Sequence, residues 1–181
     1  MQATCELLGE VGYERMSIEA VASRAGVGKQ TVYRWWPSKG VLVAEAVLTG
    51  HLRLRTAPLD DTGDLRSDLG VWLGELTAAL SDDRTASLVR ATAAAAADDE
   101  HAAAQLYQRF TGPAHQAVVA RLTAAVAVGH VRPDADLAAA ADALTGALLY
   151  RVLTRQDAVT PQRSRGLLDV VLSGLAAGQE A

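Results

Sequence analysis

Apolar residues recur every three or four positions along most of the chain, which is the spacing of an amphipathic helix. Alternating runs of β-branched or aromatic residues, which would indicate strands, are nearly absent. The pattern predicts an all-α fold of about nine helices, at 3–11, 17–26, 28–35, 38–55, 65–80, 84–97, 99–128, 136–153 and 161–177. Pro113 is expected to break or kink the seventh helix.

The segment 17–36 has the pattern of two short helices joined by a tight turn. Ile18, Val21 and Ala22 share one face of the first helix, and Gly26 allows a sharp turn after it. In the second helix Val32 and Trp36 are four positions apart and therefore point inward together. This arrangement is typical of a helix-turn-helix, whose second helix enters the major groove of DNA.

The outward positions of the second helix carry side chains that suit a duplex. Lys29 offers charge to phosphate or guanine, Gln30 an amide to a base edge, and Tyr33 a phenolic proton to phosphate. Two further residues, Ser17 and Lys39, lie at helix starts, where backbone N–H groups favour an anion. The predicted DNA-binding residues are Ser17, Gly28, Lys29, Gln30, Thr31, Tyr33, Arg34, Trp35 and Lys39.

Charge is distributed unevenly along the chain. Its net value is −4, but residues 1–50 hold five basic and five acidic side chains, so the whole acidic excess lies downstream. No Asp or Glu occurs between Ala20 and Ala44, where four basic residues fall. A cationic window on a neutral module favours nucleic acid as a partner.

Composition limits the remaining possibilities. A chain of 181 residues that is 50% hydrophobic can bury a core. One cysteine, Cys5, excludes an internal disulfide and a cysteine-rich zinc site. No apolar run reaches the length of a membrane span and no secretory signal opens the chain, so a cytoplasmic location without membrane contact is expected.

The sequence offers no constellation for catalysis. The four histidines are scattered, no pair of them lies three or four positions apart, and no Gly-rich phosphate loop follows a strand. We therefore expect no enzyme activity, no catalytic residue, no metal and no cofactor. One alternative from another class stays open: a helical protein-interaction module that does not read DNA, although such a module has no need of the acid-free window.

The N-terminal segment resembles a known family. Gly12-Tyr13, Ser17-Ile-x-x-Val-Ala and Ala25-Gly-Val-Gly-Lys-x-Thr-Val-Tyr-x-x-Trp-Pro-Ser-Lys39 together are similar to the DNA-binding domain of tetracycline-repressor (TetR/AcrR) regulators. The resemblance implies a homodimer that binds a palindromic operator, usually represses transcription, and is released by a small molecule bound in its C-terminal domain. An activator, or a regulator controlled by a protein effector, remains an alternative.

The chain departs from the family pattern at two places in the second helix. Gly28 stands where Ser or Thr is common, so this helix loses a capping hydroxyl. Trp35 and Trp36 replace a commoner His–Phe pair, and the indole N–H of Trp35 is still able to reach phosphate.

The expected organisation is a DNA-binding domain at 1–50 and a regulatory and dimerisation domain at 51–181. Two of each subunit's helices are expected to form a four-helix bundle through Leu137, Ala141, Leu144, Leu148, Leu168, Val171, Leu172 and Leu175, unless these residues complete the monomer's own core. Bulky residues with some polar groups are expected to line a site for an apolar or aromatic effector: Trp72, Leu76, Leu88, Tyr107, Phe110, His115 and Tyr150.

Overall fold

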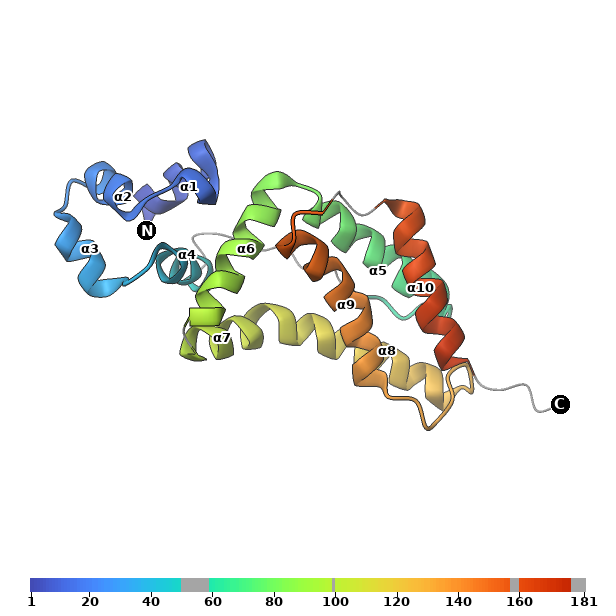
Figure 1. The fold of residues 1–181 in the computed structure, drawn as a ribbon. Coiled ribbons are helices and arrows are strands. Elements are labelled where there is room, and N and C mark those ends of the chain that lie inside the picture. The colour runs from blue at the N-terminus through green and yellow to red at the C-terminus, as the bar shows by residue number, and fades with distance from the viewer. Residues whose placement is uncertain (50–58, 99, 157–159, 177–181) are drawn as a thin grey trace. The chain divides into compact units, whose positions relative to one another are not determined.

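The computed structural model describes residues 1–49, 59–98, 100–156 and 160–176. These ranges are almost entirely helical (Figure 1), and an isolated antiparallel bridge between Val131 and Ala176 is their one β-type pairing. The all-α prediction is confirmed. None of the helices in the described ranges is long and apolar enough to cross a bilayer.

The chain forms two compact units, each built from segments that are not continuous in sequence. The first unit contains α1 (Gln2–Arg15), α2 (Ile18–Ala25), α3 (Lys29–Trp35), α4 (Lys39–Leu48), α6 (Asp83–Asp98), α7 (Glu100–Leu106) and a π-helical turn (Tyr107–Thr111). The second unit contains α5 (Leu65–Leu80), α8 (Gly112–Ala127), α9 (Leu137–Leu153) and α10 (Pro161–Leu175).

The core of the first unit is formed by residues of the first four helices and of α6. Leu7, Leu42 and Val43 are buried together with Leu88 and Ala91 of α6. A Cβ atom added to Gly40 of α4 would lie 3.3 Å from the backbone nitrogen of Ala95, so these two helices approach closely at a position without a side chain. α1 and α4, which flank the helix-turn-helix, are therefore packed on a helix that begins more than thirty positions after α4 ends.

The observed helix boundaries can be compared with the predicted ones near Gly12 and near Pro113. The first helix breaks at Gly12 as predicted, because this residue has a non-helical backbone with φ 74°, and a further helical turn within α1 then runs to Arg15. The predicted helix 99–128 is divided into α7, the π-helical turn and α8, one residue before the expected break at Pro113. The predicted end of the fourth helix, at residue 55, lies outside the described residues.

The core of the second unit is aliphatic around a single indole. Trp72 and Leu73 of α5 are buried with Val118 and Leu122 of α8 and with Leu144 of α9. At the edge of this core the Thr77 and Ser164 hydroxyl groups lie 3.0 Å apart, which joins α5 to α10 by a buried hydrogen bond.

One buried ion pair fixes the segment before α5. The guanidinium Nε of Arg121 donates to Asp68 at 2.8 Å, and both side chains are almost fully buried. Thr62 donates to the same carboxylate from its hydroxyl, at 2.5 Å, and from its backbone N–H. These hydrogen bonds, the Thr62 hydroxyl first and Arg121 second, hold the pKa of Asp68 below its ordinary value.

Candidate nucleic-acid interface

α2 begins and ends where the sequence supplies suitable caps. The Ser17 hydroxyl accepts a hydrogen bond from the backbone N–H of Ala20 at 3.1 Å. At the other end Gly26 adopts a left-handed conformation, with φ 67°, and Val27 N–H donates to the carbonyl of Ala22. The turn therefore forms because glycine occupies the one position that requires a positive φ.

α3 presents nearly all of its side chains to solvent. Val32 is its one buried residue and packs in the core of the first unit. The remaining residues of the helix are exposed: Lys29, Gln30, Thr31, Tyr33, Arg34 and Trp35. The structure thus brings these predicted DNA-binding residues together on one short surface helix.

The start and the end of α3 follow from its sequence. Gly28 is the N-cap and makes no side-chain capping hydrogen bond, as expected from the missing hydroxyl. At the other end the Trp36 indole N–H donates to Glu45 of α4 at 2.7 Å, so this half-buried ring has its polar group satisfied inside the unit. The Arg34 guanidinium lies over the ring of the exposed Trp35, 5.7 Å from its centre.

Tyr33 has an acceptor within the protein. Its hydroxyl donates to Glu19 of α2 at 3.1 Å, and this bond raises the pKa of the phenol. Hydrogen bonds from its own backbone N–H and then from Tyr33 lower the pKa of Glu19. A DNA phosphate would have to replace the Glu19 carboxylate as the acceptor of the Tyr33 proton.

Lys39 occupies the start of α4, as predicted, but its ammonium group turns back toward α1. Nζ donates to the carbonyl oxygens of Tyr13 at 2.9 Å, Glu14 at 3.2 Å and Met16 at 3.4 Å. It also lies 4.4 Å from the centre of the Tyr13 ring. The capping oxygen at this helix start belongs to Ser38, which accepts from the Val41 N–H. Lys39 therefore holds α1 and α4 together in this structure.

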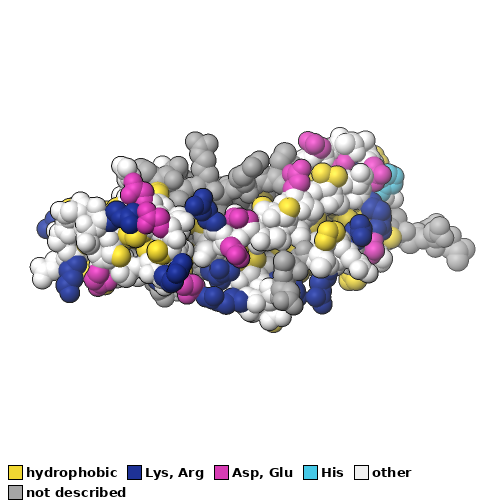
Figure 2. Space-filling model, turned by 90° about the horizontal axis from the view of Figure 1, so that it is seen from above, with side chains coloured by type: hydrophobic (Ala, Val, Ile, Leu, Met, Phe, Trp, Pro, Cys, Tyr) yellow, Lys and Arg dark blue, Asp and Glu magenta, His cyan; other side chains and the backbone are white. Residues whose placement is uncertain are grey.

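Charged groups of both signs surround the helix-turn-helix. Figure 2 shows Lys and Arg intermixed with Asp and Glu on the displayed face of the end that carries α1 to α3. Arg24 of α2 makes two hydrogen bonds, at 2.8 and 2.7 Å, with Glu10 of α1. The acid-free window of the sequence is therefore partly neutralised by acidic residues from the helix before it.

The predicted effector-lining residues divide between the two units. In the first unit Leu88 belongs to the core and Tyr107 is exposed, while the side chain of Phe110 lies outside the described residues. In the second unit Trp72 is a core residue, with Leu76 packed against that core. His115 lies 3.2 Å from Asp142, and Tyr150 is 64% exposed. A single cavity lined by this set stays a prediction.

The structure of one chain shows where the predicted dimer-forming residues lie. Ala141, Leu144, Leu148, Leu168 and Leu175 are buried in the second unit's own core, and Leu137, Val171 and Leu172 pack against it. This burial favours the alternative that these residues complete the monomer, and an interface between two copies through them stays a prediction. Leucine at helical spacing marks the buried face of a helix without telling which partner covers it.

Sequence reasoning missed the contacts that constrain the predicted DNA-binding residues. Glu19 and Tyr33 are 14 positions apart, and Lys39 lies 26 positions after Tyr13. No local pattern signals such pairs. Groups of three or more His, Cys, Asp or Glu side chains suited to a metal do not occur in the described parts of the chain.

Comparison with known proteins agrees with this geometry. A family model described as "Bacterial regulatory proteins, tetR family" matches residues 1–46, and one described as "Tetracyclin repressor-like, C-terminal domain" matches residues 59–171. The HTH-type transcriptional regulator Rv1556 of Mycobacterium tuberculosis is 32% identical over 95% of this chain and 83% of its own length. The DNA-binding transcriptional repressor TetR of Mycobacteroides abscessus is 31% identical over 78% of this chain and 73% of its own.

A solved structure shows the same fold. The TetR family transcription regulator SCO0332 has a TM-score of 0.65 and is 30% identical, with 96% of this chain and 94% of that chain covered. Members of this family are DNA-binding regulators and not enzymes, which confirms the prediction made from the absence of a catalytic constellation. The chain belongs to the tetR family of bacterial transcriptional regulators.

Proposed function

We propose that this regulator is a homodimeric repressor that reads a palindromic operator with α3. The observation that carries the proposal is the exposure of every α3 side chain except Val32. That face combines Lys29 for phosphate or guanine with the amide of Gln30 and the hydroxyl of Thr31 for base edges. The Mycobacteroides abscessus relative, which is described as a repressor, favours repression.

Homodimerisation is proposed through the outward faces of α9 and α10. On α9 the exposed residues Ala139, Ala143, Gly146, Tyr150 and Leu153 repeat at intervals of four and three. On α10 Gly166, Val170 and Ser173 are exposed in the same manner. Small residues beside large apolar ones allow close packing of two helices from each subunit in a four-helix bundle. Two copies of α3 about 34–36 Å apart would then read successive major grooves.

Release by an effector belongs to the same proposal. The family resemblance favours a small molecule bound in the C-terminal domain, and the bulky residues predicted to line its site favour an apolar or aromatic one. We expect a cytoplasmic location, where a bacterial regulator meets DNA. A thermal-shift screen of the full chain, followed by operator binding in the presence of each hit, tests this step. A compound that stabilises the protein without lowering operator affinity argues against release.

The experiment for DNA reading is selection of bound fragments from a random duplex pool, followed by titrations at several salt concentrations. We expect a motif with two-fold symmetry. Lys29→Ala should reduce the slope of log affinity against log salt by about 0.9 for each lost phosphate contact. Gln30→Ala should cost about 1–3 kcal/mol on the selected site and less on random DNA.

A matched control is Arg66→Ala, which removes an exposed arginine from α5 in the second unit. Its salt slope should equal that of the unaltered protein. Failure to recover any motif, together with salt-independent binding, would favour the interaction-module alternative. Equal losses on selected and random DNA would contradict base reading by Gln30.

A further inference from the structure

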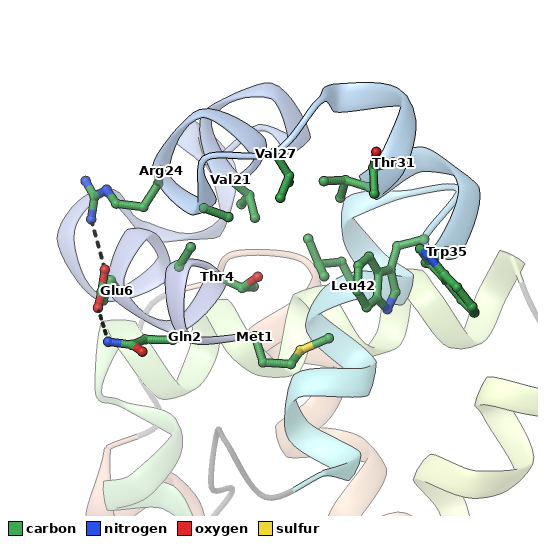
Figure 3. A pocket seen from close by; sticks show the side chains of 14 residues that line it. Met1, Gln2, Thr4, Glu6, Val21, Arg24, Val27, Thr31, Trp35 and Leu42 are labelled. Carbon is green, nitrogen blue, oxygen red and sulfur yellow. Dashed lines mark hydrogen bonds and ion pairs between the residues drawn. The ribbon is translucent and has the colours of Figure 1, made fainter.

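The first unit contains a pocket between α1 and α3 (Figure 3), which shares Thr31 and Trp35 with the proposed DNA-binding face. Its volume is about 600 Å³, and its walls come from the start of α1, from α2 and its turn, from α3 and from α4. Val21, Val27, Val32 and Leu42 make much of the lining apolar. We name it the α1–α3 pocket. Sites for drug-sized molecules have volumes of about 300–1,000 Å³.

Two adjacent indoles contribute to one wall of the α1–α3 pocket. Trp35 is 66% exposed and Trp36 is half-buried. The N–H of Trp36 is already bound to Glu45, so this ring offers its apolar surface rather than a hydrogen bond. Flat aromatic molecules pack favourably against such rings.

One polar group within the pocket lacks a partner. Thr4 is fully buried, and its hydroxyl makes no hydrogen bond in the part of the chain that the structure describes. A helical threonine ordinarily donates to a carbonyl three or four positions earlier. The Met1 carbonyl, three positions before Thr4, accepts the N–H of Cys5 at 3.1 Å but no hydrogen bond from the Thr4 hydroxyl. Figure 3 shows the Thr4 hydroxyl directed from α1 toward the middle of the pocket.

The charged groups at the rim are paired. Arg24 lies 2.7 Å from Glu10 and 3.6 Å from Glu6, as Figure 3 shows for the second pair. An ionic ligand would have to compete with these pairs. The lining therefore favours a neutral molecule over a charged one.

We propose that the α1–α3 pocket binds a neutral, flat aromatic molecule whose single hydroxyl group hydrogen-bonds to Thr4. This site lies in the first unit, beside α3, and is additional to the effector site proposed for the C-terminal domain. A bound molecule would contact Thr31, Val32 and Trp35 from within the unit and so restrict the orientation of α3.

The test uses the full chain with 2-naphthol as the probe and naphthalene as the matched compound without a hydroxyl. The three tryptophans allow location by ¹⁵N-indole NMR, with assignments from single Trp→Phe variants. We expect 2-naphthol to shift the Trp35 and Trp36 signals and to leave Trp72, a core residue of the second unit, unchanged. A shift of Trp72 alone, or no shift at all, would overturn the proposal.

Two variants test the hydrogen bond to Thr4 and the location of the bound probe in the α1–α3 pocket. Thr4→Val keeps the side-chain shape and should weaken 2-naphthol binding about two- to tenfold, the value of one hydrogen bond, while naphthalene binding stays the same. Ala25→Phe places a ring at an exposed lining position and should abolish binding of both probes. Its control is Ala78→Phe, at an exposed position on α5. Unchanged probe binding in Ala25→Phe, or equal losses of both probes in Thr4→Val, would contradict the assignment.

Discussion

The Lys39 ammonium group makes three hydrogen bonds to the carbonyl oxygens that follow the kink of α1. These carbonyls belong to Tyr13, Glu14 and Met16, at the end of a helix where acceptors lack intrahelical donors. A cation at the C-terminal end of a helix is also favoured by the helix dipole. A residue expected at a phosphate thus has a structural role that is complete without DNA.

Replacement of Lys39 tests this structural role. Lys39→Met keeps the length of the apolar stem and removes the charge, so we expect unfolding free energy to fall by about 1–3 kcal/mol. Urea unfolding followed by far-UV circular dichroism measures the change. Lys29→Met, which alters an exposed lysine of α3, should leave stability within about 0.5 kcal/mol. Equal stabilities of the two variants would show that the Lys39 contacts contribute nothing.

Thr4 offers a prediction of the opposite sign. Its buried hydroxyl has no partner in the described structure, and an unsatisfied buried hydroxyl costs about 1–3 kcal/mol. Thr4→Val should therefore raise the free energy of unfolding by about 1 kcal/mol in the absence of any ligand. Thr4→Ser, which keeps the hydroxyl, should not be stabilised. A destabilised Thr4→Val variant would mean that the hydroxyl is satisfied, for example by water.

Sequence periodicity predicted which α3 residues are exposed, because one buried position in a two-turn helix leaves the others outside. It did not predict what the exposed groups contact. Tyr33 is bound to Glu19, and Lys39 to the end of α1, through partners brought near by the tertiary fold. A pattern read along the chain contains no information on such distances.

At the scale of elements, the buried Arg121–Asp68 pair joins three parts of the second unit. Arg121 extends from α8, Asp68 from α5, and Thr62 belongs to the segment that leads into α5. Breaking a buried ion pair by removing one partner leaves an uncompensated charge in a poorly solvating environment. Asp61 of the same segment also lies 3.3 Å from Arg121, so the position of this segment depends on two carboxylates.

The lowered pKa of Asp68 fixes the direction of a pH effect. Because the folded-state pKa lies below the ordinary value of 3.8, the carboxylate stabilises the fold above that pH, and this contribution disappears as pH falls through the folded-state value. Asp68→Asn should lower the melting temperature at pH 7, and its difference from the unaltered protein should shrink below pH 4. Scanning calorimetry from pH 7 to 3 measures both. A constant difference across this range would contradict the assignment.

Helix boundaries show why local rules locate elements better than their ends. Gly12 was expected to end the first helix, and its non-helical backbone does break the helix there, but a further helical turn continues α1 to Arg15. This further turn packs in the core of the first unit through the buried Tyr13, a contact that the local preference of glycine does not predict. The predicted dimer-forming residues are a related case, because helical spacing identifies a buried face but not whether the residues that cover it come from the same chain.

At the scale of the whole molecule, the proposed dimer depends on the outward face of α9. Gly146 is exposed there, and a Cβ atom added to it meets nothing within 4 Å in the isolated chain. Gly146→Arg should therefore fold normally as a monomer but obstruct a second copy. Light scattering after gel filtration should show the mass of one chain instead of two. Ser87→Arg, on α6 in the first unit, is the control, and a dimeric Gly146→Arg variant would place the interface elsewhere.

The packing of α6 against α1 and α4 has a consequence for protein engineering. Leu88 and Ala91 of α6 complete the hydrophobic centre on which α3 depends through Val32, although α6 begins more than thirty positions after α4 ends. Helices α1 to α4 therefore do not form an independent domain that can be separated after α4 and fused to another ligand-binding domain. A peptide of residues 1–49 should show little helical circular dichroism on its own, and a chimaera that retains specificity should need α6 to be transplanted as well.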